Sequence, residues 1–168
     1  QVVQVTDGNG HVTAYAYDGA HNRIALTEAN GASWVFAYDA INRMVQRTDP
    51  LGQTAGFAYD AAGQLIRSTA ENGVVTRTDY DLLGRVVAEV RNERPGLTSD
   101  AATNVTTLYI YDSVGNRTRQ IDANGNATSY SFDLLDQLLK ETDALGQVKE
   151  YSYDAVGNLV AFKNPRGF

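Results

Sequence analysis

Hydrophobic and polar residues alternate in short runs along this chain, and the runs recur at a fixed interval. An aromatic residue followed directly by aspartate occurs seven times, at successive spacings of 21, 21, 21, 31, 21 and 21 residues. The pairs are Tyr17 and Asp18, Tyr38 and Asp39, Tyr59 and Asp60, Tyr80 and Asp81, Tyr111 and Asp112, Phe132 and Asp133, and Tyr153 and Asp154. Such a period is typical of repeat proteins, in which each unit buries its apolar surface against its neighbours.

Two runs in each repeat have the pattern of β-strands. With the aromatic residue of each pair as position 0, positions 15–21 alternate clearly, and all ten tyrosines fall at position 0 or 19. Trp34 falls at position 17, on the same strand face, because side chains alternate with period two. Positions 5–10, as in residues 64–69, carry apolar residues at both position 6 and position 7. The pattern therefore does not assign the two faces of this strand. The pattern predicts strands of six and seven residues and essentially no helix.

Residues that tolerate a left-handed backbone separate these strands. Position 4 holds Gly63, Gly84, Gly115 and Gly157, and otherwise His21, Asn42 and Asp136. Position 14 holds Gly10, Gly31, Gly52, Gly73, Gly125, Gly146 and Gly167. Aspartate three residues earlier is typical of a type I turn that a left-handed residue closes, so we expect φ > 0 at both positions. The predicted fold is an all-β antiparallel meander of 21-residue β-hairpin repeats.

Residues 1–168 are predicted to form a single array of about seven units, with an insertion loop within 91–104. This polar insertion replaces one turn, and long loops on rigid scaffolds often carry recognition. The simpler interpretation is a solvent-exposed loop that binds no partner. Both ends of the chain cut into a repeat, so we expect a section of a longer protein. Fifteen strands at about 4.8 Å each would make a sheet about 70 Å wide, and open sheets of that size tend to curl.

Composition narrows the choice of partners. The net charge of −6 and the pI near 4.8 argue against a nucleic-acid partner, which favours a basic surface. The chain has no cysteine, which excludes disulfides and zinc–thiolate sites. No segment has the length and hydropathy of a membrane span, and no signal-peptide pattern stands at the start.

Residue types that could carry chemistry occur mostly in the turns. His21 takes a left-handed turn position and His11 directly follows a turn glycine, so turn roles are the simplest interpretation of both histidines. The carboxylate pairs Asp79 with Asp81 and Asp133 with Asp136 belong to the repeat, whereas a glycosidase needs two carboxyl groups in unequal environments. We therefore predict no catalytic, cofactor-binding or metal-binding residue, and no enzymatic activity in this section.

Three weaker patterns point to ligands or modification. Residues 122–126 partly resemble the start of a calcium-binding loop, but Ala127 stands at the sixth position, where that loop requires glycine, and no helices flank it. Asn104, Asn116 and Asn126 stand in glycosylation sequons, which matter only in a eukaryotic secretory setting. The aromatic ladder could bind sugars by stacking, although packing within the sheet explains it more simply.

The motifs resemble those of the RHS/YD-repeat family. The sequence YDSVGNR at 111–117, together with TDPLG at 48–52, has the form typical of these repeats, and the resemblance covers the chain apart from the insertion. It implies a curved strip of a long sheet that winds spirally into a hollow shell. In bacterial polymorphic toxins and in the C components of insecticidal toxin complexes such shells enclose a toxic C-terminal domain, and in teneurins they form part of an adhesion ectodomain.

The resemblance implies a structural encapsulation scaffold that is secreted or displayed at the cell surface. The expected partners are further repeats of the same polypeptide and an enclosed toxin or effector polypeptide. The alternative is a glycan- or receptor-binding adhesion module. The residues expected to maintain the repeat are the seven aromatic–aspartate pairs and the turn glycines Gly31, Gly52, Gly73, Gly125 and Gly146.

Overall fold

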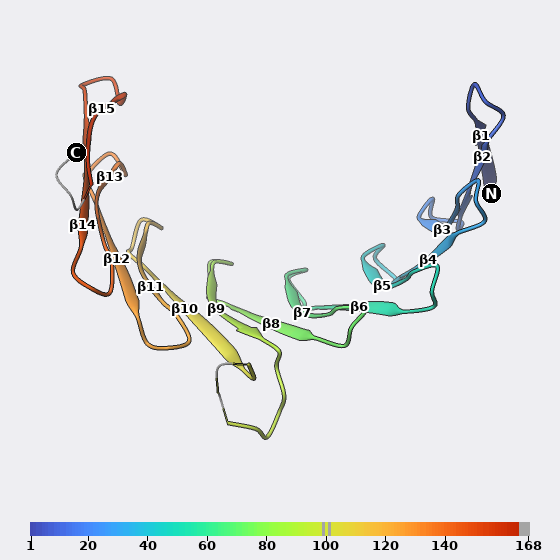
Figure 1. Ribbon diagram of the computed structural model, residues 1–168, viewed down its shortest axis with the longest axis horizontal. Coiled ribbons are helices and arrows are strands. Elements are labelled where there is room, and N and C mark those ends of the chain that lie inside the picture. The colour runs from blue at the N-terminus through green and yellow to red at the C-terminus, as the bar shows by residue number, and fades with distance from the viewer. Residues whose placement is uncertain (99, 101, 165–168) are drawn as a thin grey trace. The chain divides into compact units, whose positions relative to one another are not determined.

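The computed structural model describes residues 1–98, 100 and 102–164, and these residues form fifteen β-strands and no helix (Figure 1). Each strand is hydrogen-bonded to the strands that precede and follow it in the chain, and the pairs are antiparallel. The predicted all-β antiparallel meander of hairpin repeats is therefore confirmed. The strands are β1 Val2–Thr6, β2 Val12–Tyr17, β3 Arg23–Thr27, β4 Ser33–Tyr38, β5 Met44–Thr48, β6 Thr54–Tyr59, β7 Leu65–Thr69, β8 Val75–Tyr80, β9 Val86–Arg91, β10 Val105–Tyr111, β11 Arg117–Ile121, β12 Ala127–Phe132, β13 Leu138–Thr142, β14 Val148–Tyr153 and β15 Leu159–Lys163.

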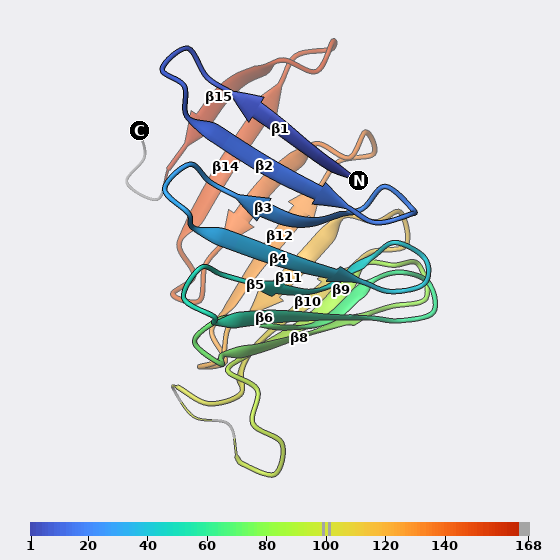
Figure 2. The same ribbon diagram turned by 90° about the vertical axis from the view of Figure 1, so that its right-hand side faces the viewer.

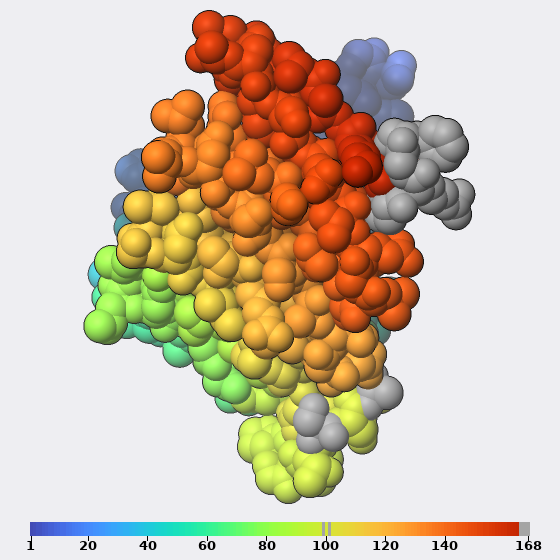
Figure 3. Space-filling model, turned by 90° about the vertical axis from the view of Figure 1, so that its left-hand side faces the viewer, coloured from blue at the N-terminus to red at the C-terminus, as the bar shows by residue number. Residues whose placement is uncertain are grey.

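The chain divides into two structural units. Unit 1 spans residues 1–77 and contains β1 to β7, whereas unit 2 spans residues 78–168 and contains β9 to β15. Strand β8 runs across the division. Figure 2 shows the hairpins of unit 1 in blue to green, and Figure 3 shows the surface of unit 2.

The turns have the predicted backbone. Among the non-glycine residues at position 4, φ is 66° at His21, 64° at Asn42 and 62° at Asp136. The described glycines at positions 4 and 14 also have positive φ, from 77° at Gly146 to 109° at Gly115. Gly167 lies outside the described residues. The predicted tight turns are thus confirmed in the described residues outside the insertion.

The strands are shorter by one residue than predicted. Most run over positions 6–10 and 16–21, as in β7 and β8. Positions 5 and 15 are excluded because their backbone N–H groups bind the turn aspartate: Gln64 N donates to Asp60 Oδ1 at 2.8 Å and Gln53 N to Asp49 Oδ1 at 2.8 Å. These residues therefore complete the turn and do not begin the strand ladder.

A β-bulge explains why positions 6 and 7 are both apolar. Tyr59 is paired with Leu65, and Ala58 with Arg67, so Ile66 is the extra residue of the bulge. The register shifts in the same way next to Tyr17, Tyr38, Tyr111, Phe132 and Tyr153. Position 6 therefore lies opposite the position 0 aromatic, and position 9 lies opposite position 19 on the same face. We call this the aromatic face.

The insertion lies between β9 and β10, and hydrogen bonds link several of its described residues. Asn92, Asn104 and Gly96 have positive φ, and the Asn104 side chain joins the two ends of the loop. Its Oδ1 accepts from Arg94 N at 2.7 Å, and its Nδ2 donates to Leu97 O at 2.8 Å. In Figure 3 the loop (yellow-green) stands out from the body of unit 2.

Neither unit has a large buried core. Among the described hydrophobic residues only Phe36 and Ala55 in unit 1, and Ala88 and Val90 in unit 2, are buried. The strand pairs in contact within each unit are neighbours in the chain. The repeats are therefore stabilised mainly by contacts to the adjacent repeat, as expected for a repeat protein.

Candidate functional site: the tyrosine–aspartate turn edge

The aspartate at position 1 organises the turn that follows the aromatic residue. Asp39 Oδ1 accepts hydrogen bonds from Ile41 N and Arg43 N, each at 3.0 Å, and Asn42 N donates to Asp39 O at 3.1 Å. The aspartates at position 11 act in the same way, because Asp143 Oδ1 accepts from Leu145 N at 2.9 Å and from Gln147 N at 2.8 Å. These carboxylates therefore accept hydrogen bonds from the backbone N–H groups of their own turns.

These hydrogen bonds favour the ionised carboxylates. The backbone N–H of Arg43 is the largest cause that lowers the pKa of Asp39 below its usual value, and the Arg43 side chain adds to it. Arg85 lowers the pKa of Asp81 in the same way. The pKa is also lowered at the turn carboxyls of Asp7, Asp18, Asp112, Asp122 and Asp154.

In two turns that lack aspartate at position 11, asparagine at position 13 takes its place as the hydrogen-bond acceptor. Position 11 is Glu28 in one turn and Ala70 in another. In these turns Asn30 Oδ1 accepts from Ala32 N at 2.9 Å, and Asn72 Oδ1 accepts from Val74 N at 3.1 Å. The same backbone N–H group at position 15 is satisfied in both kinds of turn.

The tyrosine at position 0 binds the preceding repeat through its hydroxyl group. Tyr59 Oη donates to Met44 O at 2.9 Å, and Tyr111 Oη donates to Val86 O at 2.8 Å. Tyr38 and Tyr153 donate to Arg23 O and Leu138 O at 3.1 Å. Each acceptor is the carbonyl at position 6 of the preceding repeat. The hydroxyl thus connects the end of one strand to the start of its neighbour.

Arginine at position 5 forms a clamp between consecutive turns. Arg43 Nε lies 2.7 Å from Asp39 Oδ2, and Nη1 donates to Asp60 O at 3.0 Å. The same guanidinium lies 4.7 Å from the centre of the Tyr59 ring. Each arginine therefore contacts the aspartate of its own turn and both residues of the next aromatic–aspartate pair.

Arg85 repeats this arrangement in unit 2. It pairs with Asp81 at 2.7 Å, donates to Asp112 O at 3.1 Å and lies 4.7 Å from the centre of the Tyr111 ring. The ten-residue insertion between these two repeats leaves the clamp unchanged, because the inserted loop lies at the other end of the strands.

Asparagine at position 5 forms a different clamp. Asn22 Nδ2 donates to Asn42 Oδ1 at 2.8 Å, and Asn116 Nδ2 donates to Asp136 Oδ1 at 2.7 Å. The acceptor is the left-handed residue at position 4 of the next turn. When position 5 is arginine, this next residue is glycine, as in Gly63 after Arg43 and Gly115 after Arg85. Position 5 and the following position 4 are therefore matched.

Arginines also stack on the aromatic face. Arg23 lies 4.9 Å from the ring centre of Phe36, and Arg47 lies 5.5 Å from that of Trp34. With Leu26 these residues line a hollow of about 240 Å³ in unit 1. Arg47 also pairs with Glu71, so its charge is neutralised within the sheet.

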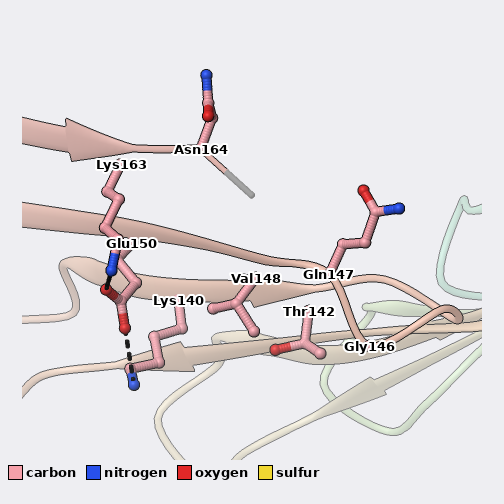
Figure 4. A pocket seen from close by; sticks show the side chains of 8 residues that line it. All are labelled: Lys140, Thr142, Gly146, Gln147, Val148, Glu150, Lys163 and Asn164. Atoms are coloured by element: carbon pink, nitrogen blue, oxygen red, sulfur yellow. Dashed lines mark ion pairs between the residues drawn. The ribbon is translucent and has the colours of Figure 1, made fainter. Parts of the chain in front are cut away.

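A larger hollow of about 780 Å³ lies on β13 to β15 in unit 2 (Figure 4). Glu150 lies between two lysines in it, with Oε1 at 3.1 Å from Lys140 Nζ and Oε2 at 3.6 Å from Lys163 Nζ. The hydrogen bond with Lys140 is the largest cause that lowers the pKa of Glu150. Glu150 thus forms ion pairs with lysines on both neighbouring strands, as is ordinary in an antiparallel sheet.

The histidines and the pair Asp133 and Asp136 lie in turns, as the sequence predicted, whereas Asp79 of the other pair lies in β8. His11 Nδ1 lies 2.9 Å from Asp7 Oδ2, and His21 N donates to Asp18 O at 3.3 Å. Asp133 Oδ1 accepts from the backbone of its own turn. Among the described residues no three histidine or acidic side chains are grouped to hold a metal ion.

The residues of the suggested calcium-binding loop and of the glycosylation sequons form hydrogen bonds within the protein. Asp122 Oδ1 accepts from Asn124 N and Asn126 N, and its Oδ2 accepts from Asn126 Nδ2, each at 2.9 Å. Both oxygens of the suggested calcium ligand are thus directed at the turn. The Nδ2 groups of Asn104, Asn116 and Asn126 all donate within the protein.

Sequence reasoning found the aromatic–aspartate pairs and the turn glycines but missed the groups that join repeats. It missed the hydroxyl bond of the tyrosines, the clamps at position 5 and the asparagines at position 13. Two signals in the sequence could have revealed them. Position 13 is asparagine in the two turns whose position 11 is Glu28 or Ala70, and arginine at position 5 is followed by glycine at the next position 4.

The sequence profile of the RHS repeat family, described as RHS Repeat, matches residues 1–33, 24–54, 59–94, 111–148 and 132–168. No curated protein matches the chain. In the part that the structure describes, no helix is long and apolar enough to cross a bilayer.

Solved structures share the fold. The chain resembles the Photorhabdus luminescens Tc holotoxin pore with a mutated TccC3 component, at a TM-score of 0.74 and 20% identity, over 94% of this chain and 9% of that one. It also resembles a TcdB2–TccC3 complex, at 0.71 and 19% identity, over 99% of this chain and 11% of the other. For TcdB2–TccC3 without its hypervariable C-terminal region the values are 0.63 and 19%, over 96% and 10%. The chain thus spans about a tenth of each matched protein.

Proposed function

This chain belongs to the RHS repeat family, and we propose that it is a section of a structural β-shell that encloses a toxin or effector polypeptide for delivery. One observation carries the proposal: the side chains that distinguish the repeat bind other parts of the sheet. Tyr59 and Tyr111 bind the preceding repeat, and Arg43 and Arg85 bind the next turn. Their chemistry is used to hold repeats together, which is what a scaffold requires.

The solved neighbours support the enclosure. Their names identify a Tc holotoxin pore and complexes of TcdB2 with TccC3, one of them without a hypervariable C-terminal region. At 19–20% identity they share the fold with this chain. We propose by analogy that the partners of this chain are further repeats of its own polypeptide and an enclosed polypeptide. A secreted or cell-surface location follows from that role.

Protection from protease tests the enclosure directly. In the full-length protein that contains these repeats, an enclosed polypeptide should survive a protease concentration that degrades the same polypeptide expressed alone. Opening the shell with a low concentration of denaturant should remove the protection. If the polypeptide is cleaved equally fast in both settings, it is not enclosed, and the proposal is wrong.

An adhesion module is the second candidate, and the hollow around Trp34 and Phe36 favours it. A rigid aromatic surface with Arg23 beside it can bind an acidic sugar by stacking and ion pairing. A glycan array with this chain and with Trp34→Ala tests the idea. Binding that vanishes in Trp34→Ala, with an unchanged melting temperature, would favour adhesion.

Tyr59→Ala gives the complementary test of the scaffold. Because Tyr59 contacts Arg43 and binds Met44 O, its removal should lower stability by about 3 kcal/mol, as for other partly buried aromatics. A glycan-binding loss in Tyr59→Ala without loss of stability would count against the scaffold role of this ring.

A further inference from the structure

Asn158, which follows the turn between β14 and β15, has a partner for one of the two hydrogens on its side-chain amide. Its Nδ2 donates to Asp154 Oδ2 at 2.9 Å. Asn22 makes the same bond to Asp18 at 2.9 Å, and it uses its second hydrogen for Asn42 Oδ1 in the next turn, at 2.8 Å. Among the described residues no second acceptor contacts Asn158 Nδ2. Asn158 therefore has the donor for a following turn without its acceptor.

Strand β15, which begins directly after Asn158, is an edge of the sheet. It pairs with β14, and no other described strand lies beside it. Its five residues are all exposed. Leu159 O is the carbonyl at position 6, and the equivalent Met44 O accepts from Tyr59 Oη of the following repeat at 2.9 Å. An edge strand of this kind presents backbone N–H and C=O groups to a further strand.

Six consecutive pairs in the chain show which following turn fits each residue at position 5. Asparagine at position 5 is followed by asparagine or aspartate at the next position 4, and arginine or glutamine is followed by glycine. Gln1, which also stands at position 5, precedes His21 and departs from this match. The matched pairs are Asn22 with Asn42, Arg43 with Gly63, Gln64 with Gly84, Arg85 with Gly115, Asn116 with Asp136 and Gln137 with Gly157.

Side-chain length explains the match. Asparagine is short, so its amide reaches the next turn where a side-chain oxygen extends toward it, as Asp136 Oδ1 does at 2.7 Å from Asn116 Nδ2. Glutamine is longer and occupies this space itself, because a Cβ at Gly157 would lie 3.1 Å from Gln137 Nε2, closer than an ordinary van der Waals contact. Asparagine before glycine, by contrast, would lose the side-chain acceptor that its amide uses in the matched pairs.

We infer that Asn158 and β15 form a docking edge for a further repeat of the same polypeptide that carries asparagine or aspartate at position 4 and tyrosine at position 0. The position 4 oxygen of that repeat accepts from Asn158 Nδ2, and its tyrosine donates to Leu159 O. A repeat with glycine at position 4 fits less well, so the edge selects among the repeats of one protein. The inference rests on the proposed scaffold function, because the partner is another repeat.

A repeat added after Lys163 tests the inference in the otherwise intact chain. A copy of residues 28–48 replaces residues 164–168, which keeps the repeat register and brings copies of Tyr38 and Asn42 to the edge. Asn158→Arg and, in the copy, Asn42→Gly are made singly and together. Urea unfolding of the four proteins gives the coupling between the two positions.

The two substitutions should be strongly coupled. Each single change breaks the match, whereas both together recreate the pairing of Arg43 with Gly63. The unfolding equilibrium constant of the double variant should therefore be at least about fivefold smaller than independent effects predict, which corresponds to one hydrogen bond. The intrinsic preference of glycine for a left-handed backbone cancels in this comparison, because it contributes equally beside either residue at 158.

Asn126→Arg is the matched control. Asn126 Nδ2 also donates to the aspartate of its own turn, Asp122 Oδ2, at 2.9 Å, but that turn joins β11 to β12 at the opposite end of the strands. Combined with Asn42→Gly in the copy, it should show no coupling.

Three results would overturn the inference. They are independent effects at Asn158, equal coupling at Asn126, and an added repeat that leaves the unfolding of the chain unchanged. The protease-protection test of enclosure is separate, because a shell can protect its contents whether or not this edge selects its neighbour, and the coupling can exist in a shell that encloses nothing.

Discussion

Single side chains in this protein form contacts both within their own turn and with the next repeat. Asp81 accepts the backbone N–H groups of Leu83 and Arg85, which fixes its own turn. Arg85 then joins that carboxylate to Tyr111 and to the backbone of Asp112 in the next repeat. A turn that is correctly formed therefore also positions the group that holds its neighbour.

Replacing Arg85 with alanine should destabilise the protein by about 1–2 kcal/mol, because a cation–π contact and a hydrogen bond to the next repeat are lost together. The measurement is urea unfolding followed by circular dichroism. Arg119→Ala is the control, since Arg119 is exposed on β11 in the same unit. Equal losses in the two variants would show that the clamp does not contribute.

The turn carboxylates make stability depend on acid pH. The pKa values of Asp39, Asp81 and Asp154 are lowered in the folded protein, so the unfolded chain binds protons more readily. Their contribution is complete above the unfolded pKa, near 3.9, and is lost as pH falls through the folded values. The free energy of unfolding should therefore be level above about pH 5 and decrease below about pH 4.

Urea titrations at a series of pH values check this prediction. Asp154→Asn should show a smaller decrease in acid, because its amide oxygen can still accept N–H groups but carries no charge that a proton removes. A free energy of unfolding that stays constant or increases down to about pH 2 would contradict the assigned role of the carboxylates.

At the scale of elements, the turns could be predicted and the strand faces could not. The residues Asp, Gly and Asn specify local backbone conformations, so their spacing alone predicted φ at His21 and Asn42. The bulge at Ile66 depends on the pairing of two strands, and a single strand sequence does not reveal it. The hydroxyl bond of Tyr59 was missed for the same reason, because its acceptor, Met44 O, is a backbone atom of another strand.

The asparagines at position 13 give a prediction for one element. Asn72→Ala should destabilise the protein by about 1 kcal/mol, because Ala70 has no side-chain oxygen to accept the N–H of Val74. Asn124→Ala should have almost no effect, since Asp122 already accepts the equivalent N–H of Asn126 at 2.9 Å. Thermal melts compare the two.

Restoring the aspartate provides the internal check on this turn. Ala70→Asp in the Asn72→Ala background should recover the lost stability, because aspartate at position 11 accepts the same N–H group. If Asn124→Ala proves as harmful as Asn72→Ala, the asparagine has a role other than that of an acceptor.

At the scale of the whole molecule, stability must come from contacts between adjacent strands. Each unit has few buried hydrophobic residues among those described, namely Phe36 and Ala55 in one and Ala88 and Val90 in the other. Two packed sheets would bury a shared core between them. The order of strands in a continuous sheet, each beside its chain neighbours, instead continues from one repeat to the next.

The curved strip that the family resemblance implies remains a prediction about shape, and solution scattering tests it. A compact domain of this length has a radius of gyration of about 15 Å. An open strip of repeats places its mass farther from the centre, so a clearly larger value is expected for the 168-residue chain. The measurement must be extrapolated to zero protein concentration, because association between molecules would also raise the value. A radius near 15 Å for the monomeric chain would mean that the strands fold back on one another and would rule out the open strip.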